Sequence, residues 1–388
     1  MRVVIAIDAF KGSITSLEAG NAAKRGVLRS CPDAQVKVLP LADGGEGTVD
    51  AFLEGLQAKK IDIEVSDPLG RKTRCTYGVL LDGTAVMEMS EASGITKLTD
   101  SERNPLYTST YGVGQMIIDA IDRGCRKFVI GIGGSATNDG GMGMLCALGY
   151  EFLDESGQTV KQGAQSLPMI TSVRTQNVHP LLKDCDFQIA CDVNNPLCGE
   201  QGATFIYGLQ KGLPTHLCQS VDEGMRHYAM VIENVLMGRE CETEHKNTSY
   251  IDYPGAGAAG GLGFAFVAVL HGKLVSGVEL ILDTIGLEKE LSNADIVITG
   301  EGRLDAQTAM GKAPIGVARR AKQHQCQAIA FAGCIGEDAE VCREKGVDAY
   351  YAIAPEDIPL DVRMQRENAL YNMETVVAKV FCEMQSER

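Results

Sequence analysis

Short runs of apolar residues alternate with longer segments of helical pattern along most of this chain. Many of the runs are continuously apolar, as is typical of parallel strands that are covered on both faces. The predicted strands are Val3–Ile7, Gln35–Leu39, Ala85–Met89, Phe128–Ile132, Phe187–Cys191, Asp295–Thr299, Ala328–Ala332 and Ala349–Ile353. The predicted helices are Ser16–Arg29, Gly47–Leu56, Gly112–Arg123, Pro314–Gln323 and Arg363–Met384. This alternation predicts an α/β fold with mostly parallel sheets.

Two of the predicted helices have sequence signals at their start. Thr15 and Glu18 have the spacing of a capping box, in which each side chain accepts a hydrogen bond from the other residue's backbone N–H. Pro314 suits the first turn of a helix, where a backbone N–H has no intrahelical partner to lose.

The length of the chain and a change in its pattern predict two domains. Single cores usually stop growing near ~250–300 residues, and this chain has 388. The first and last thirds alternate plainly between strand and helix, whereas the middle is less regular. We therefore predict a Rossmann-like α/β domain from residues 1–75 and 286–388, and a second α/β domain from residues 76–285.

Composition restricts the class of partner. The chain has 36 Lys and Arg against 51 Asp and Glu, a formal net charge of −15, which argues against nucleic-acid and anionic-membrane binding. Its longest apolar stretches, such as Phe264–Leu270, are far shorter than the roughly 20 residues that span a bilayer. The 13 cysteines include no C-x-x-C pair, so we interpret them as reduced thiols and expect a cytoplasmic protein.

Candidate chemistry gathers where predicted strands end, as expected of ligand sites in parallel sheets. The most informative segment is Gly131–Gly143, which has six glycines and follows a predicted strand. Strand, glycine loop and helix together direct backbone N–H groups at an anion. A tight turn that merely needs glycine is the alternative. The candidate binding residues are Gly133, Gly134, Ser135, Thr137, Asn138 and Asp139.

Two further loops follow the first two predicted strands. Lys11 lies just after the first strand, where it could neutralise a phosphate, although a lysine in such a place is more often an ordinary surface residue. Asp43 lies beside adjacent glycines after the second strand, where a carboxylate could hold Mg²⁺ or cap the next helix.

Two loops in the second half of the chain add acids and a guanidinium. Asp192 follows a predicted strand, with Asn194 behind it, and could act as a general base toward an alcohol or form an Asx-turn. Arg303 lies in a glycine loop with Glu301, and Lys312 follows at a predicted helix start. Arg303 could hold a carboxylate or phosphate with two hydrogen bonds, or belong to a salt-bridged turn.

Familiar nucleotide-binding and zinc-binding motifs are absent or weak in the sequence. There is no G-x-x-x-x-G-K-[ST], no protein-kinase set and no zinc H-E-x-x-H. Gly131–Ala136 spells the dinucleotide pattern G-x-G-x-x-A, but the loop continues with polar residues instead of entering a helix at once. A dinucleotide-dependent oxidoreductase of a small hydroxy acid therefore stays open as an alternative.

Four segments together resemble one family. These are IGIGGSATNDGGMGML, LADGGEGTVDAF, ACDVNNPL with the later PGAGAAGGLG, and VITGEGRLD with GKAPIGVA. In this order and spacing they resemble the class I bacterial glycerate kinases nearly from end to end. The resemblance implies two α/β domains with the active site in the cleft between them, the N- and C-terminal parts sharing one domain.

The resemblance also implies an activity. The family transfers a phosphoryl group from ATP, with Mg²⁺, to D-glycerate, most often giving 2-phosphoglycerate, in the breakdown of glycolate, glyoxylate and aldarates. We accordingly expect Asp192, Lys11 and Arg303 to be catalytic and Asp43 and Glu301 to hold Mg²⁺. The glycine-loop residues, with Asn194 and Lys312, are expected to bind substrate or phosphate. A homo-oligomer is possible.

The chain departs from the family pattern at three positions. Ala9 stands where a serine is usual, and Tyr111 and Val113 stand where arginine and threonine are common. These departures bear on the choice of acceptor more than on the reaction class. A non-catalytic sensor of sugar acids, which would bind glycerate without consuming ATP, is the second alternative.

Overall fold

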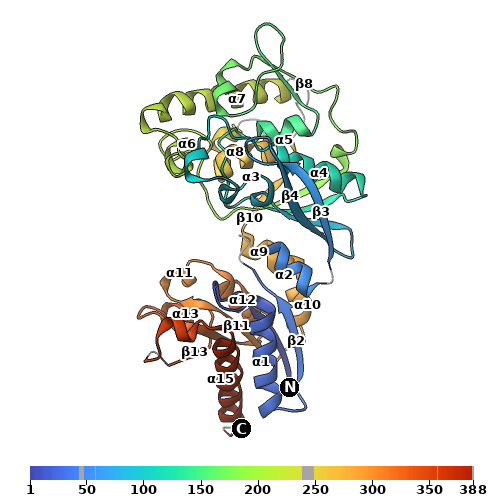
Figure 1. Ribbon diagram of the computed structural model, residues 1–388. Coiled ribbons are helices and arrows are strands. Elements are labelled where there is room, and N and C mark those ends of the chain that lie inside the picture. The colour runs from blue at the N-terminus through green and yellow to red at the C-terminus, as the bar shows by residue number, and fades with distance from the viewer. Residues whose placement is uncertain (43–47, 57, 238–248, 356, 387–388) are drawn as a thin grey trace. The chain divides into compact units, whose positions relative to one another are not determined.

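The computed structural model describes residues 1–42, 48–56, 58–237, 249–355 and 357–386. The chain divides into two compact units. Unit 1 consists of Met1–Ala58 and Val278–Arg388, and unit 2 of Lys59–Gly277. Each unit is built on its own sheet (Figure 1).

Unit 1 contains a five-stranded parallel sheet with the strand order β13-β12-β11-β1-β2. Numbered within the unit, this is the doubly wound order 2-1-3-4-5, whose direction reverses between β1 and β11. Ligands of such sheets bind beyond the carboxyl ends of the strands at this switch point. The strands are β1 (Arg2–Ile7), β2 (Gln35–Pro40), β11 (Ile296–Leu304), β12 (Gln327–Ile335) and β13 (Ala349–Ala352).

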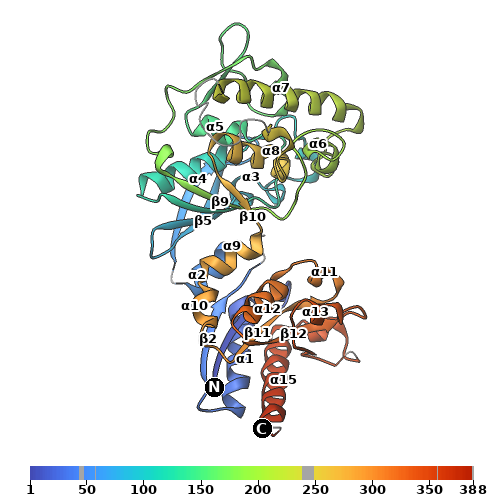
Figure 2. The ribbon, with the colours of Figure 1, turned by 180° about the vertical axis from the view of Figure 1, so that it is seen from behind.

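Helices cover the sheet of unit 1. The odd-numbered residues of β1 from Val3 to Ile7 lie in one apolar cluster with residues of α1 and α15, and these two helices lie side by side in both views (Figures 1 and 2). The helices are α1 (Ser16–Ser30), α2 (Thr48–Gly55), α9 (Gly277–Thr284, which begins at the last residue of unit 2), α10 (Leu287–Leu291), α11 (Ala306–Ala309), α12 (Ala313–Gln323), α13 (Val341–Glu344), α14 (Leu360–Arg363) and α15 (Arg366–Ser386).

The start signals of the two predicted helices are confirmed. The Thr15 side chain accepts a hydrogen bond from the N–H of Glu18, and the Glu18 carboxylate accepts one from the N–H of Thr15. Pro314 lies in the first turn of α12.

Unit 2 contains a mixed six-stranded sheet with the order β10-β9-β6-β5-β4-β3. The four strands from β10 to β5 are parallel, and β4 and β3 extend the sheet as an antiparallel hairpin. The strands are β3 (Lys59–Ser66), β4 (Lys72–Val79), β5 (Thr84–Glu88), β6 (Lys127–Gly131), β9 (Asp186–Ala190) and β10 (Lys273–Val275); a separate antiparallel pair is formed by β7 (Glu151–Leu153) and β8 (Ser172–Arg174).

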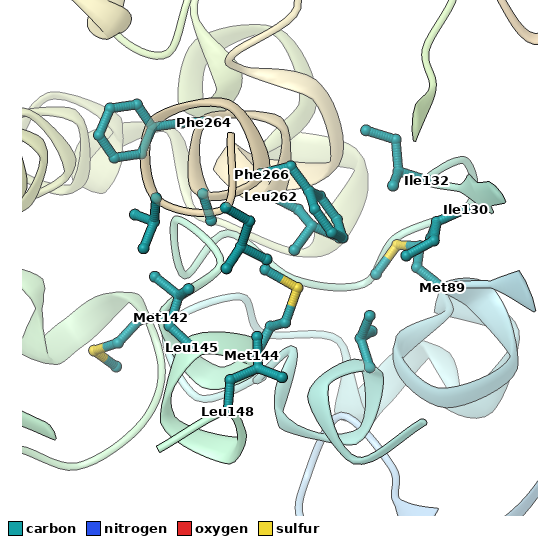
Figure 3. Packing of buried hydrophobic residues seen from close by; sticks show 14 of the residues in the cluster. Met89, Ile130, Ile132, Met142, Met144, Leu145, Leu148, Leu262, Phe264 and Phe266 are labelled. Atoms are coloured by element: carbon teal, nitrogen blue, oxygen red, sulfur yellow. The ribbon is translucent and has the colours of Figure 1, made fainter. Parts of the chain in front are cut away.

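The core of unit 2 lies beneath its glycine loop. Apolar residues that follow the loop, among them Met142, Met144 and Leu145, pack with Leu262 and Phe266 (Figure 3). The helices are α3 (Ser90–Ser93), α4 (Tyr111–Asp122), α5 (Met142–Ala147), α6 (Ala203–Tyr207), α7 (Cys218–Met237) and α8 (Ala258–Phe264). The loop is therefore joined directly to a closely packed interior.

All eight predicted strands are confirmed, within a few residues at their ends, as β1, β2, β5, β6, β9, β11, β12 and β13. The β3–β4 hairpin was not predicted, because its residues alternate between exposed polar and buried apolar positions instead of forming an apolar run. The predicted domain boundary at residues 75 and 76 lies inside β4, and the contacts divide instead after Ala58 and after Gly277.

None of the helices in the described ranges combines the length and the apolar character needed to cross a membrane.

Candidate active site

Unit 1 has a pocket of about 410 Å³ at the carboxyl ends of β1, β11 and β12. Residues from the loop after β1 and from the end of β11 line it, which places it at the switch point of the sheet. Of the residues predicted for the site, Lys11, Glu301, Arg303 and Lys312 line this one pocket. The structure therefore brings together four positions that are separated by up to 301 residues in the sequence.

Positive and negative groups are interleaved in this pocket. The Arg303 Nε lies 3.0 Å from the Asp305 Oδ2, and the Lys312 Nζ lies 3.8 Å from the Glu301 Oε2. Glu301 is buried and also accepts a hydrogen bond from the hydroxyl of Thr308. Arg303 is 65% exposed at its side chain, so its ion pair with Asp305 adds little stability and leaves the guanidinium accessible to a ligand.

Glu301 and Arg303 lie on a strand and not in the predicted loop. The expected strand ends at Thr299, but β11 continues to Leu304 and pairs with β12 over this extension. Side chains at alternate strand positions point to the same face, so both residues are directed to one side of the sheet. A strand holds them more rigidly than a loop would.

Arg363 is a residue of this pocket that the sequence did not indicate. It ends α14, and its Nε and Nη1 atoms are buried without a hydrogen-bond partner among the described residues. Unpaired buried donors are costly, and an oxyanion in the pocket would satisfy them. Its sequence context, at the start of a predicted helix, gave no sign of this placement.

Ser13 has the same property in the loop after β1. Its hydroxyl lines the pocket and is buried without a partner among the described residues. Asp8 is buried at the start of this loop, and its carboxylate accepts a hydrogen bond from the N–H of Ala9. Lys11 is exposed near the tip of the loop. The loop therefore carries both a positive charge and an unused hydroxyl.

In unit 2 the glycine loop has an exposed part and a buried part. Gly133 and Gly134 are exposed, whereas Thr137, Asn138 and Asp139 are completely buried. Gly134 has a φ of +71°, which favours glycine, and a Cβ added at Gly133 would meet nothing within 4 Å. Only the first part of the predicted binding loop is therefore open to a ligand.

Asp139 holds the loop together from the inside. Its carboxylate accepts hydrogen bonds from the N–H and hydroxyl of Thr110 and from the N–H groups of Gly141 and Gly143. Burial raises the pKa of Asp139 despite these four hydrogen bonds, which lower it. With no exposed surface, this carboxylate acts on a ligand only through the loop that it holds.

The loop is also fixed by Lys211, which the sequence did not indicate. Its Nζ donates to the Ser135 hydroxyl and to the Thr137 carbonyl, each at 2.7 Å. Lys211 is 3% exposed, and burial lowers its pKa to about 7, against a smaller opposing effect of Asp139. The position is 76 residues from Ser135, so no local pattern could connect the two.

Asp192 and Asn194 lie beyond the carboxyl end of β9, next to the strand that leads into the glycine loop. Both are exposed, and the Asp192 Oδ1 accepts a hydrogen bond of 2.9 Å from the N–H of Gly277. One carboxylate oxygen of Asp192 is thereby oriented, which suits a group that must meet an alcohol.

Glu88 is a second acid at this edge that the sequence analysis missed. It is the buried last residue of β5, the neighbour of β6, and its Oε2 lies 3.4 Å from the Ser90 hydroxyl. The signal was available, because an apolar strand ending in an acid is the same pattern that identified Asp192.

The other predicted metal ligand, Asp43, lies outside the described residues. Within the described ranges, no group of three or more His, Cys, Asp or Glu side chains is arranged to hold a metal ion. The acids that line the pocket of unit 1 are Asp8, Glu301 and Asp305.

The three departures from the family pattern have different surroundings. Ala9 lines the pocket of unit 1. Tyr111 is half-buried at the start of α4, and its N–H donates to the Ser109 hydroxyl. Val113 is 1% exposed in the core of unit 2, so the missing hydroxyl there changes packing and not a ligand contact.

Comparisons with known proteins agree with this arrangement. The model of the glycerate kinase family matches residues 3–385. A glycerate kinase of Haemophilus influenzae is 44% identical over 382 residues, covering 98% of both chains. A glycerate 2-kinase of Escherichia coli K12 is 40% identical over 354 residues, covering 91% of this chain and 90% of the relative.

A solved structure is also similar. A crystal structure from Salmonella typhimurium LT2, assigned to glycerate kinase 2, has a TM-score of 0.89 and 37% identity, and the match covers 100% of this chain and 99% of that one. The resemblance of the four glycine-containing segments is thus confirmed over the whole chain. The protein is a kinase that belongs to the glycerate kinase family.

Proposed function

We propose that the protein transfers the γ-phosphoryl group of ATP to the 2-hydroxyl of D-glycerate, with Mg²⁺, and so forms 2-phosphoglycerate. The observation that carries this proposal is the end-to-end match to the family, which includes the Escherichia coli relative named glycerate 2-kinase. Neither an oxidoreductase nor a non-catalytic sensor agrees with membership of a kinase family, and we propose neither.

The pocket of unit 1 is the better candidate for the nucleotide. Phosphoryl transfer needs positioning and charge stabilisation more than covalent chemistry by the protein. Lys11, Arg303 and Lys312 supply positive charge, and Arg363 supplies unpaired donors. Ile353, Ala354 and Leu360 add an apolar wall to the same pocket, as a nucleobase would require.

Mg²⁺ fits the acids of this pocket. Glu301 is buried beside Lys312, and Asp8 lines the same space. When bound, Mg²⁺ would neutralise charge on the phosphates. Glu301 is the residue that we propose to hold it, and Asp43 stays a prediction because it lies outside the described residues.

The edge of unit 2 suits the acceptor. We assign to Asp192 the role of general base, which orients and deprotonates the attacking hydroxyl, because its carboxylate is accessible and fixed by the Gly277 N–H. We assign the rest of the small acid to Gly133, Gly134 and Ser135, together with Asn194, which follows Asp192 in the same exposed segment. Thr137, Asn138 and Asp139 would support this loop from below.

In these assignments the two substrates bind to different units, and an active site in a cleft between the units stays a prediction of the resemblance. The cytoplasmic location, the homo-oligomer and the role in glycolate, glyoxylate and aldarate breakdown also stay predictions.

The proposal is tested by a coupled ADP-release assay with D-glycerate and Mg-ATP, followed by phosphorus NMR of the product. We expect ADP release that needs both D-glycerate and Mg²⁺, with 2-phosphoglycerate as product. Formation of 3-phosphoglycerate would overturn the choice of hydroxyl but not the acceptor. No release above the rate without acceptor would overturn the acceptor itself.

A further inference from the structure

The turn that carries Lys211 is built to direct its side chain inward. Helix α6 is followed by a short 3₁₀ helix, Leu209–Lys211, which ends at Gly212 with a φ of +91°. A Cβ at Gly212 would collide with the carbonyl oxygen of Arg103, so the turn packs directly against another segment of unit 2. Lys211 is thereby held with 3% exposure.

This segment contacts the buried part of the glycine loop at two points. The Lys211 Nζ donates to Ser135 and Thr137, each at 2.7 Å, and the Asn138 Nδ2 donates to the Thr204 hydroxyl on α6 at 3.0 Å. The loop from Ser135 to Asn138 is therefore attached to α6 and its following turn. Ser135 connects this buried attachment to the exposed Gly134.

Among the residues that the structure describes, none forms an ion pair with Lys211. Both of its hydrogen-bond acceptors, the Ser135 hydroxyl and the Thr137 carbonyl, are neutral. Asp139 favours the charged form through space, but its own carboxylate already accepts four hydrogen bonds. A buried cation of this kind is costly unless a counter-charge is supplied.

The outer part of the loop offers the place for such a counter-charge. Gly133 and Gly134 are exposed, and their N–H groups have no acceptor within the described ranges. Successive free backbone N–H groups form an anion-binding concavity. An anion held there would be next in sequence to Ser135, whose hydroxyl accepts from the buried ammonium group.

We propose that Lys211 is a positioning residue for the acceptor substrate: it fixes Ser135 and Thr137 so that the Gly133–Ser135 loop binds the carboxylate of glycerate, and it takes up a proton when that carboxylate binds. This inference rests on the proposed function and deepens it, because it assigns one functional group of the substrate to one loop. Lys211 does not touch the substrate and acts through Ser135.

The inference has a defined pH dependence. The pKa of Lys211 is lowered to about 7 by burial, so the free enzyme loses this proton as the pH rises above 7. A bound carboxylate favours the charged form and raises the pKa. The affinity for glycerate therefore decreases above pH 7, by up to about tenfold per pH unit, until the pKa of the bound state is reached.

Two charged residues lie near the Lys211 turn, Asp139 and Arg103. Asp139 is buried behind the loop, and its pKa is raised by burial. Arg103, whose backbone contacts Gly212, forms its ion pair with Asp100 at 2.9 Å.

Calorimetry tests the proposal on the intact protein. D-glycerate is titrated into the protein at pH 8 in two buffers with different ionisation enthalpies, and the difference gives the number of protons taken up. We expect uptake that approaches one proton per glycerate bound. Glycerate binding without proton uptake would overturn the inference.

Two variants separate charge from packing. Lys211→Met keeps the length of the side chain but removes the charge, and should weaken glycerate binding by roughly ten- to a hundredfold and abolish proton uptake. Lys211→Arg keeps a permanent positive charge, and should recover affinity without proton uptake. Lys273→Met, at an exposed lysine of β10, should leave both quantities unchanged.

Thermal unfolding of each variant shows whether it is folded. If Lys211→Met is unfolded, Lys211→Arg and the wild-type proton count still decide the inference. Affinity that is equal in wild type and folded Lys211→Met would overturn it.

The same titration with Mg-ADP distinguishes the two sources of an anion. Proton uptake with the nucleotide and none with glycerate would assign the loop to a phosphate and overturn the carboxylate assignment. If ADP release shows turnover of D-glycerate but no proton is taken up, only this inference fails. If D-glycerate is neither bound nor turned over, the proposed function fails as well.

Discussion

The pocket of unit 1 and the glycine loop of unit 2 both lie at carboxyl ends of parallel strands, yet they use different chemistry. The pocket exposes charged side chains, with Arg303 65% exposed, and lies at the switch point of a doubly wound sheet. The loop exposes backbone at Gly133 and Gly134 and buries its polar side chains, together with the ammonium group of Lys211.

The difference matches the charge of the two substrates in our proposal. A nucleoside triphosphate has several negative charges, which the several positive side chains of the unit 1 pocket can balance. A small hydroxy acid has one, and a rigid loop with one buried lysine can meet it. The two regions can therefore be tested separately, because a change in one should alter the handling of only one substrate.

The largest effect is expected from Asp192→Asn. Loss of the general base should reduce kcat by about 10²–10⁴-fold, while the Michaelis constant for ATP changes little. Steady-state kinetics with both substrates varied measures this. Asp186→Asn, at the exposed opposite end of the same strand, is the control, and a near-normal kcat for Asp192→Asn would remove the base assignment.

Removing positive charge from the pocket of unit 1 should have the next largest effect. The double variant Lys11→Ala, Arg303→Ala is expected to raise the Michaelis constant for ATP by about ten- to a hundredfold. The Michaelis constant for glycerate should stay within about twofold of the wild-type value, a change well below the tenfold that corresponds to ~1.4 kcal/mol. Arg29→Ala, at the exposed end of α1, is the control. A larger change for glycerate than for ATP would reverse the two assignments.

Asp139→Asn tests whether the loop of unit 2 is held from the inside. The amide NH₂ of asparagine is a donor, so it cannot accept the hydrogen bonds from backbone N–H groups that one of the Asp139 oxygens now accepts. We therefore expect a loss of about 1–3 kcal/mol in the free energy of unfolding. Urea denaturation measures it. Asp154 also accepts several hydrogen bonds but is only partly buried, and Asp154→Asn should cost clearly less. Equal losses would show that burial of Asp139 does not matter.

The smallest effect is expected at the capping box of unit 1. Thr15→Ala removes the side-chain acceptor at the start of α1 and should cost about 1 kcal/mol of stability, without a change in either Michaelis constant. Thermal unfolding and kinetics of Thr15→Ala are compared with those of Thr159→Ala, at an exposed position of unit 2. A change in substrate affinity would connect α1 to the site, contrary to our account.

The sequence was sufficient for the parts of the fold that local pattern determines. Continuous apolar runs located the parallel strands, and Thr15 with Glu18 located a helix start. The β3–β4 hairpin was missed because its apolar residues alternate with charged ones, for example Ile61, Ile63 and Val65. That period-two pattern was present in the sequence and could have been recognised.

The site was less predictable, because its decisive features depend on distant contacts. Polar residues in the glycine loop were expected to face a ligand, but Asp139 is needed inside as the acceptor for the loop's own N–H groups. Lys211 lies in a short turn and Arg363 at the start of a predicted helix, and neither segment has a motif that indicates a site. Only the fold shows that Lys211 contacts the glycine loop and that Arg363 lines the pocket of unit 1.

The assignment of the nucleotide to the unit 1 pocket and of glycerate to the unit 2 loop is tested most directly by hydrogen–deuterium exchange. The exchange of the intact protein is measured with Mg-ADP alone and with D-glycerate alone. We predict that Mg-ADP protects the segments around residues 8–13 and 301–312, and that D-glycerate protects the segment around residues 131–141. Protection of the glycine loop by Mg-ADP, or of the unit 1 pocket by D-glycerate alone, would contradict the account.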